Sequence, residues 1–364
     1  MVIRSLLICL VLGLLLSVFY GLVTRVSFKN QRGHISSLYC ALIKNDPAFS
    51  KPIIFLPGIK GSLLRSNERQ EWLTRSQILL DSEPLLYKLE DPDLEPIGIL
   101  TRISLLPGLL EYSPYQHISA TLACNPNAYF LSYDWRRNPI ENAARLGELV
   151  DRVQQETGQK PSIIAHSMGG LVTHTYLKTN SEKIDRVVYV GVPFQPGVGF
   201  LPDIDQGSAI GLNKTILSKE AIFSHPSSFT LLPHAGQRLY KNQDLMNIET
   251  WKEHRLSIFR DGSVDEIAFK RILADATAFH REIDRPVTFS NHFLFVVGNC
   301  QQTHHSIETD GSFTYVSGDG RVPESSAYPV EKEQLNKEIF ISCATHDQQL
   351  NDRNVLERIE AFLK

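Results

Sequence analysis

The chain of 364 residues is long enough for one large domain or two ordinary ones, and 42% hydrophobic against 21% charged residues supplies a substantial core. This composition excludes an intrinsically disordered chain and a coiled coil. With 37 basic and 40 acidic residues, the net charge of -3 gives no broad electrostatic footprint for nucleic acid.

The first feature along the chain is an uncharged run at residues 5–23. At about 1.5 Å per residue, a helix of this length just spans a hydrocarbon core of roughly 30 Å. A cleaved secretory signal is the alternative, but the apolar run is long and no A-x-A-like cleavage site follows. We therefore expect a membrane anchor, or a secreted protein if the segment is cleaved. Arg4 on one flank and Arg25, Lys29 and Arg32 on the other leave the side of the membrane open.

Residues 1–28 are thus set apart from a body at residues 29–364, where short β-rich runs alternate with helical patterns. This alternation is typical of an α/β fold with a mostly parallel sheet and helices on both faces. The expected strands are residues 52–57, 129–133, 162–165, 186–192, 293–297 and 338–342, and the expected helices are residues 140–156, 168–177 and 351–363.

Two stretches of the body are too long for ordinary connections between such elements. One covers about residues 62–127, between the first and second strands, and the other about residues 195–290, between the fourth and fifth. We expect the first to form a lid insertion and the second a cap insertion.

The cysteines lie far apart, with no C-x-x-C pair and no run of histidines at metal-ligand spacing. This spacing disfavours a structural zinc site and a disulfide-dense scaffold. One or two disulfides are compatible with it, and simple buried thiols are the interpretation that we favour. The five cysteines are Cys9, Cys40, Cys124, Cys300 and Cys343.

Residues 162–170 read S-I-I-A-H-S-M-G-G. A strand that runs straight into small-x-Ser-x-Gly-Gly and then into a helix is typical of the nucleophile elbow of an α/β-hydrolase, which predicts Ser167 as the nucleophile. The turn strains the backbone of Ser167 and lifts its hydroxyl over the sheet edge. Ala165 stands where glycine is commoner. His166 is expected to point away from the hydroxyl and either to pack in the core or to support the residues that react. An inert strand-to-helix turn is the alternative.

Residues 56–62, L-P-G-I-K-G-S, follow the first strand and predict the rest of an oxyanion hole. Gly58 and Gly61 let the backbone approach a substrate carbonyl closely. The N–H groups of Ile59 and Met168 are our candidate oxyanion donors, the second being at the start of a helix. A plain glycine turn is the alternative.

In this fold the acid and then the base follow the nucleophile along the chain. His346, after the last expected strand, meets the condition for the base. Asp319, between two glycines in G-D-G-R-V-P, meets the condition for the acid that orients the imidazole. His304, His305 and Asp310 are the alternatives, but they come early in the chain and suit a surface loop.

Six short motifs occur in a fixed order across roughly residues 52–350. They are P-G-I-K-G-S (57–62), Y-D-W-R (133–136), A-H-S-M-G-G (165–170), G-V-P (191–193), P-S-S-F-T-L-L-P (226–233) and G-D-G-R-V-P (318–323). Together they resemble the lecithin–cholesterol acyltransferase family, which includes lysosomal phospholipase and phospholipid–diacylglycerol acyltransferase. The resemblance implies an α/β-hydrolase core with a lid and a cap, and a triad that moves a fatty acyl group from a glycerolipid to water or an alcohol.

Carried over by motif, the resemblance makes Ser167 the nucleophile, Asp319 the acid and His346 the base, with Ile59 and Met168 as oxyanion donors. It calls for no metal and no organic cofactor.

The Y-D-W-R motif matches a family element near the site. Because Asp134 and Arg136, two residues apart at a strand end, more often brace loops than react, we expect them to support the site together with Trp135 and Gly58.

The chain departs from the animal members of the family in its lid region. Those members close a loop there with a disulfide, whereas residues 58–123 contain no cysteine. Residues 71–73, E-W-L, and residues 79–80, L-L, form either an apolar lid surface or a loop packed by one tryptophan.

We therefore predict a serine-dependent O-acyltransferase or lipase that acts on ester bonds of glycerolipids. Its expected partners are a lipid substrate and a membrane surface, not nucleic acid or a metal ion. An esterase or thioesterase on soluble acyl esters is the alternative enzyme, and an inactive hydrolase scaffold used for binding is a further alternative. The sequence leaves the acyl position, the acceptor and the oligomeric state open.

Overall fold

A computed structural model describes most of the body of the chain. The described residues are 27–29, 32–34, 51–67, 69–88, 94–106, 110–123, 125–262 and 264–364. The predicted anchor at residues 5–23 and three of the cysteines, Cys9, Cys40 and Cys124, lie outside them. Within the described ranges, no helix combines the length and the apolar composition that crossing a membrane requires.

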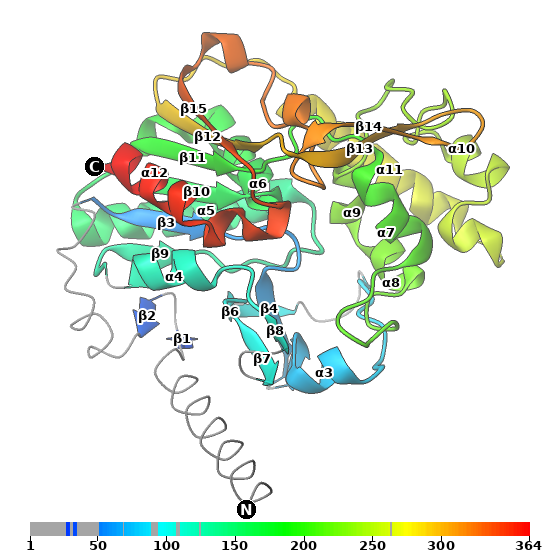
Figure 1. Cartoon of the computed structure of the whole chain (residues 1–364), viewed down its shortest axis with the longest axis horizontal. Coiled ribbons are helices and arrows are strands. Elements are labelled where there is room, and N and C mark those ends of the chain that lie inside the picture. The colour runs from blue at the N-terminus through cyan, green and yellow to red at the C-terminus, as the bar shows by residue number, and fades with distance from the viewer. Residues whose placement is uncertain are drawn as a thin grey trace, which may run out of the picture.

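A six-stranded sheet forms the centre of the molecule, in the order β15-β12-β11-β10-β3-β9, and every neighbouring pair runs parallel (Figure 1). Strands β3 and β10 are buried along their whole length, as expected where helices cover both faces of a parallel sheet. The strands are β3 (Ile53–Leu56), β9 (Ala128–Phe130), β10 (Ser162–His166), β11 (Arg186–Val190), β12 (His292–Gly298) and β15 (Asn336–Ser342).

The strand predicted at residues 129–133 ends early, because β9 stops at Phe130 rather than at Tyr133. Leu131 still donates a backbone hydrogen bond to Phe55. The N–H of Tyr133, however, donates to the hydroxyl of Ser62, 3.1 Å away, so the chain leaves the sheet to join the insertion that follows β3.

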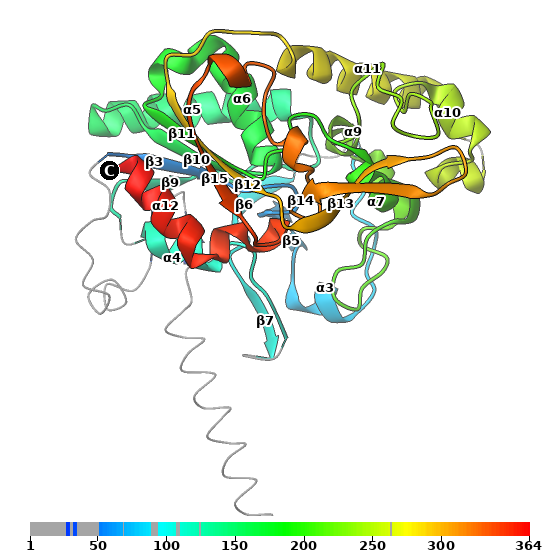
Figure 2. The same cartoon turned by 45° about the horizontal axis from the view of Figure 1, so that its top comes forward.

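Helices cover both faces of the sheet (Figure 2). Helices α5 (Pro139–Thr157) and α6 (Met168–Asn180) pack on one face, and α4 (Gln116–Ala123) and α12 (Arg353–Leu363) on the other, each with its own cluster of buried apolar side chains. Helix α5 begins after the capping side chain of Asn138 and ends at Gly158, whose φ of 70° suits glycine at a helix end.

The insertion between β3 and β9 contains a small antiparallel sheet in the order β5-β4-β6 and a β7–β8 hairpin. Its elements before α4 are β4 (Ser62–Ser66), β5 (Arg69–Trp72), α3 (Arg75–Leu79), β6 (Glu95–Ile99), β7 (Ile103–Leu106) and β8 (Leu110–Tyr112). A separate pair of strands, β1 (Ser27–Lys29) and β2 (Arg32–His34), precedes the sheet.

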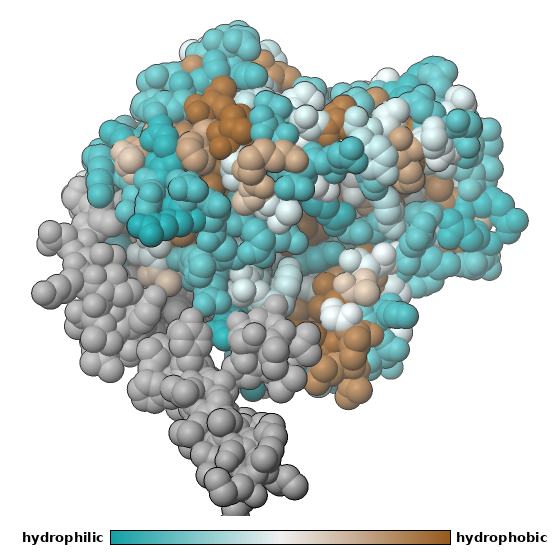
Figure 3. Space-filling view, in the orientation of Figure 1, coloured by the Kyte–Doolittle hydropathy of each residue, from teal (hydrophilic) through white to brown (hydrophobic). Residues whose placement is uncertain are grey.

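The two segments predicted as a possible apolar lid surface, residues 71–73 and 79–80, differ in their exposure to solvent. Trp72 and Leu73 are buried, and Trp72 packs edge-to-face on Trp135 with ring centroids 5.2 Å apart. The interpretation of a loop packed by one tryptophan therefore holds for residues 71–73, and that of an apolar surface there is wrong. Leu79 and Leu80 are 45% and 66% exposed, and apolar surface gathers over this part of the molecule (Figure 3).

The insertion between β11 and β12 is helical and lies beside one end of the sheet (Figure 1). We call residues 198–283 the cap. Aromatic side chains fill its interior, including Phe223, Phe229, Trp251 and Phe269. Its elements are η2 (Val198–Phe200), α7 (Leu201–Gln206), α8 (Lys219–Ser224), α9 (Pro226–Thr230), α10 (Ile248–Glu253), η3 (Ser257–Arg260) and α11 (Glu266–Ile283).

A hairpin of β13 (Gln301–Ile307) and β14 (Phe313–Gly318) stands between β12 and β15 and was not predicted. The short helices η1 (Ser181–Lys183), η4 (Glu324–Ser326), η5 (Lys332–Gln334) and η6 (His346–Asn351) complete the described elements.

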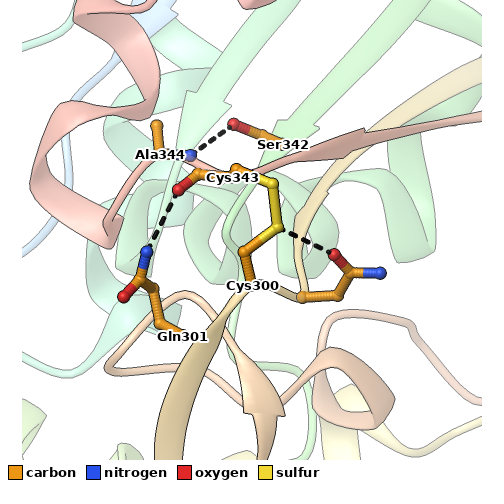
Figure 4. The surroundings of a disulfide bond; sticks show 6 residues. Cys300, Gln301, Ser342, Cys343 and Ala344 are labelled. Atoms are coloured by element: carbon orange, nitrogen blue, oxygen red, sulfur yellow. Dashed lines mark hydrogen bonds between the residues drawn. A yellow bond between two sulfur atoms is a disulfide. The ribbon is translucent and has the colours of Figure 1, made fainter.

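The prediction of simple buried thiols is wrong for Cys300 and Cys343, which form a disulfide (Figure 4). The cause is the register of the sheet, since β12 and β15 are parallel neighbours that pair Gly298 with Ser342 at their carboxyl ends. Both cysteines therefore leave the sheet at the same edge, with Cα atoms 4.9 Å apart, although they are 43 residues apart in the sequence. The side-chain amide of Gln301 also donates to the Cys343 carbonyl oxygen, 3.2 Å away.

Candidate active site

Ser167 occupies the turn between β10 and α6, with φ 52° and ψ -127°, the strained geometry of an elbow. The two glycines after Met168 are needed because α6 starts in close contact with its surroundings. A Cβ on Gly169 would lie 2.4 Å from the Pro57 carbonyl oxygen, and one on Gly170 would lie 2.1 Å from a methyl carbon of Val192. The local sequence thus fits the tight strand-to-helix connection that exposes the serine hydroxyl to the sheet edge.

The three predicted triad residues meet at this edge. The Ser167 hydroxyl donates to Nε2 of His346 at 3.0 Å, and Nδ1 of His346 donates to Oδ2 of Asp319 at 2.8 Å. A backbone hydrogen bond also joins the loops that carry these two residues, since the His346 N–H donates to the Asp319 carbonyl oxygen at 2.9 Å. We call residues 319–323 the acid loop and residues 343–346 the base loop.

The pKa values of Asp319 and His346 are shifted in the directions expected for an acid that orients a base. Burial acts to raise the pKa of Asp319, but the charge and hydrogen bond of His346 and the N–H groups of Arg321 and Val322 outweigh it, so this pKa is lowered. Burial acts to lower the pKa of His346, but the charge and hydrogen bond of Asp319 raise it above its usual value. Asp319 thereby strengthens the imidazole as a base and fixes the proton on Nδ1.

Residues 57–61, the oxyanion loop, pass directly against the nucleophile. A Cβ on Gly58 would lie 2.8 Å from Cβ of Ser167 and 3.3 Å from its Oγ. Within the described residues, no protein group accepts a hydrogen bond from the N–H of Ile59 or of Met168. Both predicted donors are therefore free to bind an oxyanion beside Ser167.

The alternative acid and base residues lie in the β13–β14 hairpin. His304 stacks on Phe313 with ring centroids 4.5 Å apart, and Asp310 accepts from the N–H and hydroxyl of Ser312 in the hairpin turn. The carbonyl oxygen of His305 faces Gly197 at the edge of the cap. These contacts stabilise the hairpin, and none of them involves Ser167.

The Y-D-W-R motif holds the insertion after β3 onto the core. Asp134 accepts from Nε and Nη2 of Arg136 at 3.0 and 2.8 Å, and Arg136 donates to the Leu86 carbonyl oxygen at 2.9 Å. The indole N–H of Trp135 donates to the Ser62 carbonyl oxygen at 3.2 Å. These residues support the loops around the site and make no contact with the triad in the part of the chain that the structure describes.

A family model described as lecithin:cholesterol acyltransferase matches residues 120–337, more than half of the chain. The chain belongs to this family. The uncharacterized protein YJR098C of Saccharomyces cerevisiae is 29% identical over 242 residues, a match that covers 60% of this chain and 36% of that protein. The chain thus spans about a third of the length of that curated relative.

Solved structures resemble the chain in fold. A chain of the Tle4–Tli4 complex gives a TM-score of 0.55 at 12% identity and covers 86% of this chain and 99% of its own length. The mature lipase BlEst2 of Bacillus licheniformis gives a TM-score of 0.42 at 13% identity and covers 88% of this chain and 94% of its own. At such identities the likeness concerns the fold alone. The parallel six-stranded sheet and the strand-to-helix elbow at Ser167 are those of an α/β-hydrolase fold.

The protein has a hollow between the core and the cap, with an empty volume of about 380 Å³ when open solvent is included. The oxyanion loop borders it through Ile59, and the cap contributes mainly apolar side chains such as Phe200, Ile204 and Leu217. An apolar lining next to the oxyanion loop suits the chain of an acyl group.

A charged group closes one side of this hollow. Asp203 on α7 of the cap pairs with Arg321 of the acid loop at 2.5 Å and with Lys60 of the oxyanion loop at 3.7 Å. Burial lowers the pKa of Lys60, although Asp203 opposes this effect. One carboxylate of the cap thus joins the two loops that flank the triad.

The sequence did not identify Tyr115, and it left His166 open between packing in the core and support of the reacting residues. Both ring nitrogens of His166 have partners other than Ser167, namely the Tyr115 hydroxyl and the carbonyl oxygen of His346 in the base loop. His166 is adjacent to the nucleophile, which could have marked it, whereas no motif surrounds Tyr115.

Among the described residues, no group of three or more His, Cys, Asp or Glu side chains is arranged as ligands of a metal ion.

Proposed function

We propose that the protein is a serine-dependent O-acyltransferase or lipase that acts on ester bonds of glycerolipids. The observation that carries the proposal is the unbroken chain of hydrogen bonds from Ser167 Oγ through the imidazole of His346 to Asp319, with distances of 3.0 and 2.8 Å. It joins residues from three distant parts of the sequence at the edge of a parallel sheet, where such enzymes place their catalytic groups.

In the first step, Nε2 of His346 takes the Ser167 proton while Oγ attacks the ester carbonyl carbon. The carbonyl oxygen becomes an oxyanion, and the N–H groups of Ile59 and Met168 stabilise it. Asp319 stabilises the imidazolium that forms. The tetrahedral intermediate then expels the lipid alkoxide, which receives the proton from His346 Nε2 and leaves as an alcohol.

The acyl group now forms an ester with Ser167 Oγ. In the second step, His346 takes a proton from water or from a lipid hydroxyl, whose oxygen attacks the acyl carbon. Collapse of the new intermediate returns the proton to Ser167 Oγ and releases a fatty acid or a new ester. The exclusion of water by the cap decides between these two acceptors.

Support for a lipid substrate comes from the hollow beside Ile59, whose mainly apolar lining suits hydrocarbon better than a polar group. The uncharged run at residues 5–23 would hold the site near such substrates if it anchors the chain in a membrane.

The test is incubation of the full chain with phospholipid vesicles whose two acyl chains are distinguishable, with and without a long-chain alcohol. We expect release of one acyl chain as fatty acid, and a new ester in the presence of the alcohol if transfer occurs. Mass spectrometry of the lipids reports the acyl position and the acceptor together.

Ser167→Ala is the matched control, since it removes one oxygen atom and should leave the fold intact. A rapid reaction with short soluble esters and none with vesicles would instead support an esterase or thioesterase on soluble substrates. No reaction with either class would contradict the proposal.

A further inference from the structure

His166 lies between the oxyanion loop and the base loop and bonds toward both. On one side, Tyr115, which directly precedes α4, places its hydroxyl 2.9 Å from Nδ1 of His166, and the same hydroxyl oxygen accepts from the N–H of Gly58 at 2.7 Å. On the other side, Nε2 of His166 lies 3.1 Å from the carbonyl oxygen of His346. All of these groups are buried.

The partners of His166 and its lowered pKa together place the protons of this hydrogen-bond network. A backbone carbonyl can only accept, so Nε2 of His166 carries a proton and donates it to the His346 carbonyl oxygen. Because burial keeps His166 neutral, Nδ1 carries no proton and accepts from the Tyr115 hydroxyl. The Tyr115 oxygen in turn accepts from the N–H of Gly58.

The surroundings keep His166 neutral while the base changes charge. Burial, followed by the nearby charge of His346, lowers the pKa of His166 to about 3. The two rings are 4.8 Å apart, so an imidazolium at both positions would be strongly disfavoured. A neutral His166 leaves the positive charge of the reaction to His346.

We propose that His166 and Tyr115 are positioning residues that hold the oxyanion loop and the base loop in register on the two sides of Ser167. This inference rests on the proposed function. The hydrogen bonds of His166 and Tyr115 end at Gly58, which is adjacent to the proposed oxyanion donor Ile59, and at the backbone carbonyl of the proposed base His346. Neither His166 nor Tyr115 touches the reacting atoms.

The arrangement matters because the oxyanion donors and the base must be correctly placed at the same moment. Misplacement by about 1 Å can cost on the order of a hundredfold in rate. Removing the Tyr115 hydroxyl would leave the N–H of Gly58 and Nδ1 of His166 without partners in a buried place, so both loops would shift or admit water.

The chain supplies a matched control in a second buried tyrosine–histidine pair. The Tyr189 hydroxyl lies 3.1 Å from Nδ1 of His174, and neither residue bonds to the oxyanion loop or the base loop within the described residues. Tyr189→Phe thus removes the same kind of bond from the same core without touching the two loops.

The experiment measures inactivation of the full chain by an alkyl fluorophosphonate, which reports the reactivity of Ser167 without requiring the natural substrate. We expect Tyr115→Phe and His166→Ala to lower kinact by about tenfold to a hundredfold, with KI within roughly twofold of the unchanged protein. His166→Gln retains a donor for the His346 carbonyl and should recover much of the rate. Tyr189→Phe should leave kinact within about twofold, because it disturbs only the core.

Thermal unfolding of each variant separates positioning from folding. The inference is supported if Tyr115→Phe and Tyr189→Phe lower the melting temperature similarly while only the first slows inactivation. It is overturned if the two variants slow inactivation equally, or if His166→Ala reacts as fast as the unchanged protein. If the unchanged protein does not react at all, the proposed function fails first and this inference falls with it.

Discussion

Two buried histidine–carboxylate pairs in this molecule behave in opposite ways. At the sheet edge, His346 donates to Asp319 at 2.8 Å and its pKa is raised. Within the core, Nε2 of His174 lies 3.5 Å from Glu331, and its pKa is lowered. Both pairs are almost fully excluded from solvent. A neighbouring carboxylate is therefore not sufficient to make a buried histidine a strong base.

The difference lies in what else each carboxylate binds. Glu331 accepts from the ammonium group of Lys178 at 2.5 Å, so its charge is already matched and burial of His174 prevails. Asp319 accepts from two backbone N–H groups and pairs with no lysine or arginine side chain in the described residues, so its charge acts on His346. The first pair is a candidate for chemistry, and the second holds α6 to the loop that carries Glu331.

The largest expected effect is the loss of acyl release when the triad is removed. Ser167→Ala and His346→Ala should each lower the rate by about 10⁴-fold or more, because the nucleophile and its base act as a unit. Release of labelled fatty acid measures this, with circular dichroism as the check on folding. If His305→Ala silenced the protein and His346→Ala did not, the assignment of the base would be wrong.

Asp319→Asn tests whether the charge of Asp319 is what makes His346 a base. The rate should fall by about 10⁴-fold, since the amide cannot hold the correct imidazole tautomer or stabilise the imidazolium. The active form carries a neutral His346, and Asp319 raises the pKa of this residue above its usual 6.5. Activity of the unchanged protein should therefore rise with pH through a midpoint above 6.5, and the residual activity of the variant through a lower one.

Lys178→Met tests the opposite pair. Removing one partner of a buried ion pair costs about 3–5 kcal/mol, so the free energy of unfolding should fall by that amount. The folded fraction should keep its reaction rate with a fluorophosphonate, because the pair does not contact the triad. Denaturant unfolding and labelling kinetics on the same sample measure both quantities, and a slowed reaction at unchanged stability would overturn the structural role.

A smaller effect is expected from Cys300→Ser combined with Cys343→Ser. The disulfide joins residues that are 43 positions apart in the sequence. Removing it should lower the free energy of unfolding by about 2–4 kcal/mol. Unfolding of the unchanged protein with and without a reductant is the companion measurement. Equal stability in all three samples would mean that the two loops are held without this bond.

The sequence was sufficient for the parts of the fold that depend on local pattern. Alternating strands and helices predicted the parallel sheet, and the small residues around Ser167 predicted a tight turn between strand and helix. Asp319 and His346 could be named from their motif and their order along the chain. His346 follows β15 of the central sheet, whereas Asp319 follows β14 of the hairpin, which the sequence did not predict.

The features that could not be predicted from the sequence depend on which strands are neighbours and on contacts between residues far apart in the chain. The Cys300–Cys343 disulfide requires knowing that β12 and β15 are neighbours. The role of Tyr115 follows from a hydroxyl that lies between Gly58 and His166, residues 57 and 51 positions away along the chain. The sequence could not decide whether Trp72 forms lid surface or packs inside a loop, because periodicity does not reveal the partner that covers it, which is Trp135.

The most direct test of the central claim is to label the full chain with an alkyl fluorophosphonate and to map the adduct by mass spectrometry of proteolytic peptides. We predict a single phosphonate on Ser167, formed by the unchanged protein and lost in both Ser167→Ala and His346→Ala. An adduct at another residue, or labelling of Ser167 that persists at full rate without His346, would contradict the account.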